Sequence, residues 1–286
     1  MVTPNRDLLA RAFRRPGASR PPVDAGDGEG MRAFLLRRQQ QFQAPPRPLV
    51  ALPHADELPT EHGRIWRREL RYPLAALHGT VALTSLPGIA GERLATLGKD
   101  PALAVVRPEQ CLFLDTETTG LAGGAGTVVF AYGLGFLRAS ELVVEQLFLR
   151  DFGEEPAVLH YVAARLAEFP VPVTFVGKSY DRHRIAARLA VHKIKAPVLT
   201  PVHLDLYHAV RRLYGKQWPD ARLRTAEERL LGLVRHDDLP GSEAPAAFLD
   251  WIRDRTGPVD RVLEHNRLDV LSLAALLAVL AGGEKS

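Results

Sequence analysis

Three apolar segments between residues 111 and 150 constrain the fold most strongly. Residues 111–114 lead into two acidic positions, residues 127–137 form a long apolar run, and residues 142–150 place apolar side chains on two alternating faces. Such patterns are typical of β-strands. Residues 138–141 suit a tight turn, so we expect the three strands to form an antiparallel meander.

The segments after this meander alternate between helix and strand patterns. We expect helices over residues 156–169 and 181–192, a fourth strand over 171–176, and either a fifth strand or a helix start at 203–206. The remainder is expected to be helical, ending in a helix over about 259–280. This order predicts an α/β fold with a mixed sheet and helices on both faces.

The chain before the meander divides into two parts by composition. Residues 1–62 are expected to form a largely disordered, basic and proline-rich arm, with one short amphipathic helix over 31–42. Residues 63–107 are expected to be a small extension that packs on the main domain, residues 108–286. Within the extension we expect strands at 65–72 and 80–83 and a helix at 91–97.

Positive charge is concentrated in the arm. Residues 1–48 carry nine Lys or Arg and four Asp or Glu, a net charge of +5, whereas the whole chain carries +4. The remainder is therefore at −1. A basic arm on a nearly neutral body fits a nucleic-acid partner, or a protein partner recruited through the arm. A solvated arginine-rich tail is the alternative interpretation.

The single cysteine and the apolar segments favour a cytoplasmic protein. Cys111 alone excludes a disulfide framework within the chain and a cysteine-based zinc site. No export signal is recognised at the N-terminus. The longest apolar run, residues 273–281, is shorter than the roughly 18 residues of a membrane helix. We expect a buried helix there, and no membrane association.

Asp115 and Glu117 directly follow the first apolar strand segment. Two residues apart on a strand, both carboxylates lie on one face. Like charges at that distance repel each other unless a cation holds them. The alternative is an exposed strand with solvated acids, but the apolar residues Leu112, Phe113 and Leu114 in front of the pair argue against it.

Three further acidic positions have simple structural interpretations when each is taken alone. His265 and Asp269 lie four residues apart on one face of the expected last helix, where such a pair contributes about 0.3–0.5 kcal/mol. Asp181 follows the fourth strand and suits a helix N-cap. Asp205 suits an N-cap as well, with a metal-binding role as the alternative interpretation. Because Asp115 and Glu117 are already candidates for a cation site, the His265–Asp269 pair and Asp181 become candidates for the same site.

Together these residues resemble the three motifs of the DEDD exonucleases. The motifs are Asp115-Thr116-Glu117-Thr118-Thr119-Gly120, Val176-Gly177-Lys178-Ser179-Tyr180-Asp181 and His265-Asn266-Arg267-Leu268-Asp269. The chain also resembles the YprB-like ribonuclease H-like family, in the segments 121–127, 148–151 and 265–273. This similarity covers about residues 63–282. It implies a ribonuclease H-like fold and 3′→5′ exonuclease activity.

The resemblance also implies a two-metal mechanism. His265 would accept a proton from the attacking water. Two Mg²⁺ or Mn²⁺ ions would be held by four carboxylates, those of Asp115, Glu117, Asp181 and Asp269. Two positions depart from the pattern. Val176 stands where the second motif usually begins with Asn, and His265 precedes Asp269 by four residues, the spacing of the tyrosine-type branch rather than the histidine-type branch.

Five residues near the motifs are candidates for contacts with a single-stranded end of DNA or RNA: Thr118, Leu121, Lys178, Tyr180 and Arg182. The resemblance implies that Leu121 packs on the terminal base. Tyr180 either stacks on a base or is a partly buried core aromatic. Lys178 and Arg182 either contact phosphates or form solvated surface.

Two other functions fit the same sequence. One is a catalytically weak nucleic-acid-binding module of this fold, which Val176 and the unusual third motif favour. The four acids count against it, because clustered carboxylates repel phosphate unless a metal intervenes. The other is a scaffold whose basic arm recruits a polymerase or helicase.

Overall fold

The computed structural model describes residues 49–120, 126–195 and 202–282 of the 286-residue chain. The chain divides into two units, Met1–Arg47 and Pro48–Ser286, and the fold described below is that of the second. The helix expected over 31–42 and the candidate substrate residue Leu121 lie outside the described residues.

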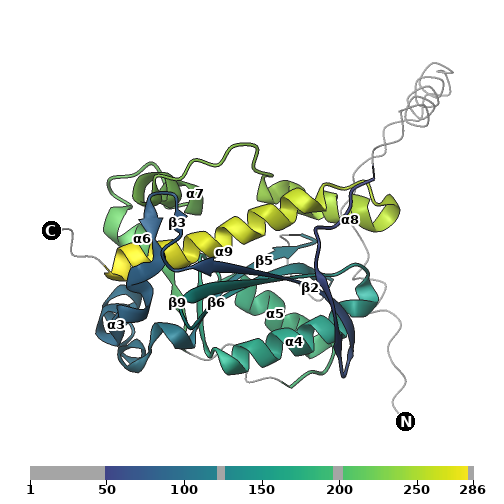
Figure 1. Cartoon of the computed structure of the whole chain (residues 1–286), viewed down its shortest axis with the longest axis horizontal. Helices are drawn as coiled ribbons and strands as arrows, with labels where there is room; N and C mark the ends of the chain where they lie inside the picture. Colours follow the sequence, from purple (N-terminus) through teal and green to yellow (C-terminus); the bar gives the residue numbers. More distant parts are fainter. Residues whose placement is uncertain (1–48, 121–125, 196–201, 283–286) are drawn as a thin grey trace, which may run out of the picture. The chain divides into compact units, whose positions relative to one another are not determined.

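A seven-stranded mixed sheet forms the centre of this unit, in the order β1-β2-β7-β6-β5-β8-β9 (Figure 1). Strands β5, β6 and β7 form the expected antiparallel meander, and β8 and β9 continue the sheet in parallel with β5. The strands are β1 (Asp56–Thr60), β2 (Gly63–Pro73), β5 (Cys111–Thr118), β6 (Val129–Arg138), β7 (Glu141–Phe148), β8 (Val171–Thr174) and β9 (Leu204–Asp205). A separate hairpin pairs β3 (Leu77–His78) with β4 (Val81–Ala82).

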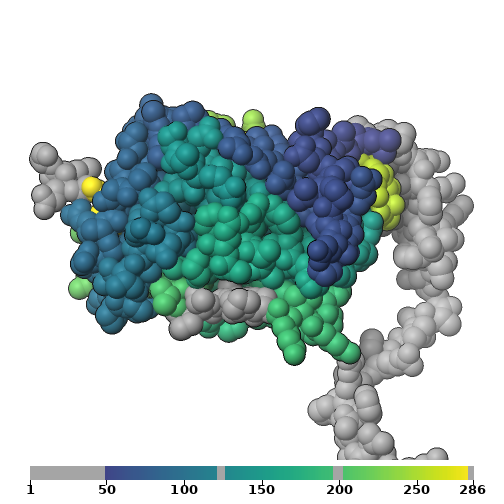
Figure 2. All heavy atoms as spheres, turned by 60° about the horizontal axis from the view of Figure 1, so that its bottom comes forward, coloured from purple at the N-terminus to yellow at the C-terminus, as the bar shows by residue number. Residues whose placement is uncertain are grey.

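Helices cover both faces of the sheet, as the sequence predicts. Helix α9 (Val259–Gly282) runs across one face, and α4 (Glu155–Glu168) and α5 (Asp181–Val191) cover the other (Figure 1). Figure 2 shows the α4 and α5 face with its side chains. The remaining helices are α3 (Gly91–Gly98), α6 (Leu206–Tyr214), α7 (Leu223–Ala226) and α8 (Ala244–Asp254), with a π-helical turn at Glu227–Leu231 and 3₁₀ turns at Leu83–Gly88, Pro101–Val105, Pro108–Gln110, Phe152–Glu154 and Gly241–Glu243.

Helix α9 contributes buried residues to the hydrophobic core from its second half and candidate site residues from its first half. Its second half packs into the core, with Leu271, Leu273, Leu276 and Leu277 all buried. By length and composition α9 could cross a membrane, but 61% of its most apolar window is buried inside the protein. The helix packs on β5, β6 and β7, so the apolar run at 273–281 lies in a buried helix, as expected.

Two glycines of β6 allow α9 to approach the sheet closely. A Cβ atom at Gly133 would lie 2.6 Å from the Asn266 side chain and 2.6 Å from Val270, and one at Gly135 would also lie 2.6 Å from Val270. Contacts this short do not occur between real side chains, so the helix seats directly on the backbone of β6. This contact brings the polar first half of α9 against the end of β5.

Some sequence-based boundaries differ from the structure. Residues 56–60, expected in the proline-rich arm, belong to β1. Pro59 is accommodated there because β1 is an edge strand. The strand expected over 171–176 ends at Thr174, because Val176 has a left-handed φ of 69°. The proposed extension contributes β2, which pairs with β7 along its length. The division into arm, extension and main domain stays a prediction.

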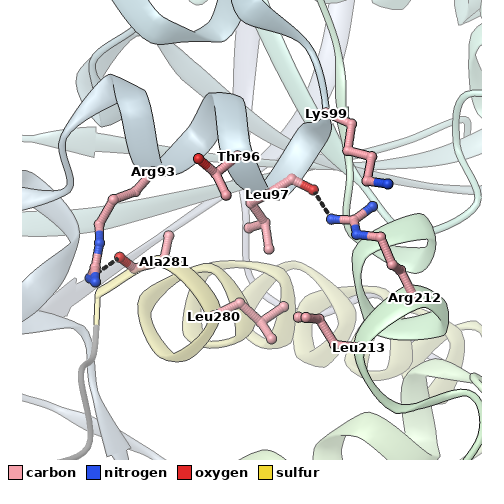
Figure 3. A pocket seen from close by; sticks show the side chains of 8 residues that line it. All are labelled: Arg93, Thr96, Leu97, Lys99, Arg212, Leu213, Leu280 and Ala281. Carbon is pink, nitrogen blue, oxygen red and sulfur yellow. Dashed lines mark hydrogen bonds between the residues drawn. The ribbon is translucent and has the colours of Figure 1, made fainter.

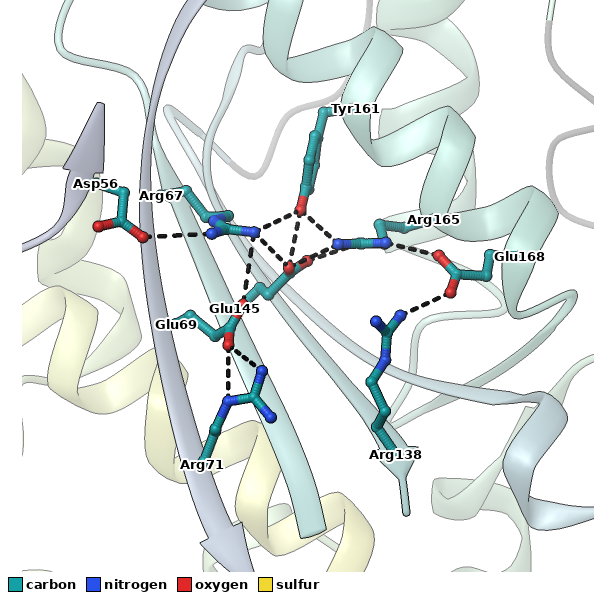
Figure 4. Close-up of polar contacts among 9 residues, drawn as sticks. All are labelled: Asp56, Arg67, Glu69, Arg71, Arg138, Glu145, Tyr161, Arg165 and Glu168. Carbon is teal, nitrogen blue, oxygen red and sulfur yellow. Dashed lines mark hydrogen bonds and ion pairs between the residues drawn. The ribbon is translucent and has the colours of Figure 1, made fainter. Parts of the chain in front are cut away.

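A buried carboxylate ties the edge of the sheet to α4. Glu145 on β7 is fully buried and accepts hydrogen bonds from Tyr161 at 2.8 Å, Arg165 at 2.8 Å and Arg67 at 3.2 Å. Arg165 and Arg67 pair further with Glu168 and Asp56 at the surface (Figure 4). The network joins β2, β7 and α4 on the face opposite α9.

Candidate active site

A cavity of about 280 Å³ lies at the carboxyl end of β5, near the middle of the sheet. Its walls include seven residues of the three motifs, Asp115, Thr116, Glu117, Thr118, Tyr180, His265 and Asp269, together with Gly241, Ser242 and Pro245; Asp181 is not among the lining residues. The carboxyl ends of strands are the usual ligand position in open α/β sheets. Strand β5 and helix α9 therefore bring together residues about 150 positions apart in the sequence.

Mutual repulsion and burial perturb the acids at this cavity. Burial raises the pKa of Asp115 well above its ordinary value, and the charges of Asp269, Glu117 and Asp181 raise it further. The pKa of Glu117 is raised in the same way, by burial and then by Asp269 and Asp181. Burial raises the pKa of Asp181 to about 6. The four carboxylates are thus close enough to interact electrostatically.

Two acids of the cluster are held by neutral hydrogen-bond donors. The Thr116 hydroxyl donates to Asp181 Oδ1, so Asp181 faces the cluster from the first turn of α5 and is not the helix N-cap. Asn266 Nδ2 donates to Asp115 Oδ2 at 2.8 Å. Asn266 is fully buried and in turn accepts a hydrogen bond from Gln146 on β7. A polar bridge from β7 through α9 therefore fixes Asp115.

His265 is oriented by an aspartate that the sequence analysis did not identify. Its Nδ1 lies 2.8 Å from Asp238 Oδ1. A carboxylate only accepts hydrogen bonds, so Nδ1 carries a proton, and in the neutral imidazole Nε2 is the acceptor nitrogen. Nε2 lies 3.7 Å from Asp269 Oδ2, at the cavity. The Asp238 contact thus fixes both the tautomer and the direction of the imidazole ring.

The sequence analysis did not identify Arg235 either, although this residue contacts the carboxylate cluster directly. Its Nη2 lies 2.5 Å from Asp269 Oδ1, and the same nitrogen bonds Glu227. Arg235 and Asp238 belong to the charged run Arg235-His236-Asp237-Asp238. Such a run between helices resembles ordinary solvated surface, so it gives no functional signal by itself.

Among the described residues, no group of three or more His, Cys, Asp or Glu side chains is arranged as a metal site. Asp115, Asp181 and Asp269 each turn one oxygen to a protein donor. The donor set still fits a hard divalent cation. It consists of neighbouring carboxylates, and burial first and the charges of the other acids second raise the pKa values of Asp115 and Glu117.

The second motif forms a loop held by Asp205. Asp205 Oδ1 accepts from the backbone N–H of Val176 at 2.9 Å, and Oδ2 accepts from that of Lys178 at 3.0 Å. The same residue caps α6 through the N–H of Tyr207, which confirms the N-cap interpretation. Lys178 and Arg182 are not among the residues that line the cavity. Their proposed substrate contacts stay predictions.

Thr118 and Tyr180 form one wall of the cavity. The Tyr180 hydroxyl lies 2.8 Å from Thr118 Oγ1 and 3.3 Å from the carbonyl oxygen of Gly120. The guanidinium of Arg184 lies over the Tyr180 ring. The ring is partly buried, and it joins the first motif to the second. Its hydroxyl is therefore placed at the edge of the cavity, beside the acids.

A larger cavity, of about 390 Å³, lies away from the acids, between α3, α6 and the end of α9 (Figure 3). Three cations, Arg93, Lys99 and Arg212, line it beside Leu97 and Leu280. Arg93 and Arg212 donate to the carbonyls of Ala281 and Leu97, at 3.1 and 2.6 Å. These bonds complete the C-terminal ends of α9 and α3, so the two arginines have a structural role there.

Comparison with known proteins shows three similarities that bear on this chain. A family model described as the RNase_H superfamily matches residues 112–281. The uncharacterized protein YprB of Bacillus subtilis is 32% identical over 217 residues, which are 73% of this chain; the chain spans about half of that relative, 51% of its length. A family B DNA polymerase structure from the archaeon Pyrobaculum calidifontis is similar with a TM-score of 0.44 and 16% identity, over 59% of this chain and 24% of the polymerase.

Proposed function

Because the chain belongs to the RNase_H superfamily, we propose that it is a divalent-metal-dependent nuclease that hydrolyses phosphodiester bonds of nucleic acid. The observation that carries the proposal is that Asp115, Glu117 and Asp269, from β5 and α9, line one cavity, with Asp181 of α5 beside them, bonded to Thr116. Burial and neighbouring negative charges raise the pKa values of Asp115, Glu117 and Asp181. A site this negative repels phosphate unless cations accompany it.

These four carboxylates would hold two Mg²⁺ or Mn²⁺ ions. Cations bound there supply positive charge to the phosphate oxygens and lower the pKa of the attacking water. Asn266 and Thr116 would each hold one oxygen of Asp115 and Asp181 and so fix the orientation of these two carboxylates. Such partners of metal-binding carboxylates matter because they fix the orientation of the ligand oxygens.

His265 would act as the general base. In the neutral imidazole the Asp238 hydrogen bond keeps the proton on Nδ1, so Nε2, on the side of Asp269 at the cavity, would accept a proton from the attacking water. The imidazolium formed would then be stabilised by Asp238, because its Nδ1–H already bonds that carboxylate.

We further propose DEDD-type 3′→5′ exonuclease action on single-stranded ends. The three motifs support this, and Thr118 and Tyr180 lie at the cavity, where an end nucleotide would contact them. A cytoplasmic location and a protein partner for the basic arm are proposed from composition alone.

End-labelled single-stranded DNA and RNA of one sequence, incubated with Mg²⁺, Mn²⁺ or EDTA, test the proposal. We expect a ladder that shortens from the 3′ end with metal and is absent with EDTA. Asp115→Ala should abolish it. Asp260→Asn is a matched control, because Asp260 is an exposed acid on the same helix as Asp269. Full cleavage by Asp115→Ala would refute the site assignment.

One observation favours a second candidate, the catalytically weak nucleic-acid-binding module. The ion pair between Arg235 and Asp269 neutralises one of the four acids. Metal-dependent binding of a labelled oligonucleotide without any product in the same assay would support this candidate over the nuclease.

A further inference from the structure

Positive charge within the second unit is concentrated in one segment. Residues 171–219, which contain β8, α5, β9 and α6, carry nine Lys or Arg and two Asp or Glu, a net charge of +7. Residues 49–286 together carry −1, so the rest of that stretch is at −8. The cations of the body are thus gathered on a few neighbouring elements.

The buried charges of this segment already have partners. Arg188 pairs with Glu155 of α4 at 2.5 Å. Asp181 belongs to the carboxylate cluster, and Asp205 is buried and accepts hydrogen bonds from backbone N–H groups. The other charged residues of the segment are all cations: Lys178, Arg182, Arg184, Lys193, Lys195, Arg211, Arg212 and Lys216.

Asp205 places the loop after β8 beside the first turn of α6. Its carboxylate accepts from the N–H groups of Val176 at 2.9 Å, Lys178 at 3.0 Å and Tyr207 at 3.1 Å. The rings of Tyr207 and Phe175 are also in contact, with centroids 5.8 Å apart. One buried carboxylate therefore fixes the backbones of Lys178 and Tyr207 side by side.

Two further cations flank this junction. Burial first, and then the charges of Lys178 and Arg182, lower the pKa of His203 to about 3, so both cations lie near that buried ring. Arg211 is exposed and follows Tyr207 by one turn on the same face of α6. We call Lys178, Arg182, Tyr207 and Arg211 the basic surface.

The basic surface lies next to the cavity, on the side of β8 and β9. Strands β5, β8 and β9 are parallel neighbours, so their carboxyl ends follow one another along one edge of the sheet. Tyr180, which lines the cavity, belongs to the same loop as Lys178. Two strand spacings separate the ends of β5 and β9 by roughly 10 Å, a distance that a short strand of nucleic acid spans.

On the other side of the cavity, exposed arginines are paired with acids. The end of β7 lies at the same edge of the sheet, and Arg150 there pairs with Glu57 and Glu154. On α8, Arg253 pairs with two neighbouring aspartates. A polyanion that leaves the cavity is therefore attracted toward α6 rather than toward β7.

We propose that the basic surface binds the sugar–phosphate backbone of the nucleic-acid strand where it leaves the cavity, so that the strand runs from β5 across β8 and β9 to α6. Lys178, Arg182 and Arg211 contact phosphates without regard to base sequence. The partly exposed Tyr207 ring among these cations offers a surface on which a base stacks, which favours a nucleic acid over an acidic peptide. The course of the strand rests on the nuclease function proposed above.

The test is binding of a labelled oligothymidine of about twelve nucleotides to the full chain in EDTA, followed by fluorescence anisotropy over a range of salt concentrations. The informative variant is Lys178→Gln with Arg211→Gln, which removes two charges from side chains that are at least partly exposed. The matched control is Arg138→Gln with Arg253→Gln. It removes the same charge from side chains 50% and 62% exposed, and Arg138 ends β6 at the edge of the sheet opposite the cavity.

We expect the informative variant to bind the oligothymidine about fivefold or more weakly at low salt, and the slope of log affinity against log salt to fall by about 1.4. The control should change neither quantity appreciably. With Mg²⁺ or Mn²⁺, KM for cleavage of the same strand should rise about fivefold in the informative variant while kcat stays unchanged, because the contacts of the scissile phosphate lie in the cavity. Melting curves establish that both variants are folded.

The outcomes separate this proposal from the nuclease. Equal affinities of both variants, or cleavage without any binding in EDTA, would overturn the basic surface. Oligoglutamate of equal charge that displaces the strand as well as unlabelled oligothymidine does would assign the surface to acidic peptides and overturn the proposal too. Binding in EDTA that the informative variant loses, without cleavage under any metal condition, would refute the nuclease and the course of the strand but leave phosphate binding by the basic surface.

Discussion

Replacing Asp181 by Asn should stabilise the metal-free protein at neutral pH. Asp181 is buried, and its carboxyl group has a pKa raised from 3.8 to about 6 by burial and by the neighbouring charges of Asp205 and Asp269. Asn has nearly the same shape and can still accept the hydrogen bond that Thr116 donates. The substitution therefore removes the charge with little change in packing.

The size and sign of the effect follow from proton linkage. A rise of about two pKa units, at about 1.4 kcal/mol per unit, corresponds to roughly 3 kcal/mol. Below pH 3.8 the group is protonated in both the folded and unfolded states and costs nothing. Between pH 3.8 and about 6 the unfolded state loses the proton first, so the free energy of unfolding falls as pH rises. The amide of the Asp181→Asn variant does not titrate, so this loss disappears.

Urea unfolding in EDTA, followed by tryptophan fluorescence, measures the effect at pH 4 and pH 7.5. We expect Asp181→Asn to raise the free energy of unfolding by about 3 kcal/mol at pH 7.5 and by less than about 1 kcal/mol at pH 4. Saturating Mn²⁺ should reverse the order at pH 7.5, because the unchanged protein gains more from metal binding. An equal effect at both pH values, or destabilisation in EDTA at pH 7.5, would refute the electrostatic account.

Three more substitutions test other parts of the structure. Val176→Asn should raise the free energy of unfolding by about 1 kcal/mol in chemical denaturation, because a β-branched residue is strained at φ 69° and Asn is not; no gain would contradict this. Glu145→Ala should lower it by about 3–5 kcal/mol, since Arg67 and Arg165 lose their buried partner, and a loss below about 1 kcal/mol would count against the network. Asp238→Asn should lower kcat for cleavage by about 10–100-fold with little change in KM, measured with labelled single strands; unchanged kcat would remove Asp238 from the site.

Local spacing in the sequence was sufficient to predict most of the fold. The meander follows from two apolar runs and one segment with two alternating faces, and the buried α9 follows from its apolar run. The positions of Asp115 with Glu117 and of His265 with Asp269 follow from strand and helix periodicity within single elements. Each of these inferences concerns neighbours in sequence, where side-chain direction is fixed by the backbone.

Partners distant in sequence could not be predicted in this way. Asn266 bonds Asp115 across 151 positions, and Arg235 reaches Asp269 across 34. Arg235 and Asp238 also lie between helices, where periodicity gives no side-chain direction. Conversely, Lys178 and Arg182 are close to the second motif in sequence but do not line the cavity. Proximity along the chain is therefore a poor guide to membership of this site.

Two glycines of β6 set the distance between helix α9 and the sheet, and with it the spacing of the acids in the site. Gly133 meets Asn266, the residue that holds Asp115, and Gly135 meets Val270, the residue next to Asp269. A single methyl group at either position would push the helix away from the sheet. Asp269 on the helix would then lie farther from Asp115 and Glu117 on the strand. Alignment of the reacting groups thus depends on two residues without a functional group, which searches for chemically active side chains pass over.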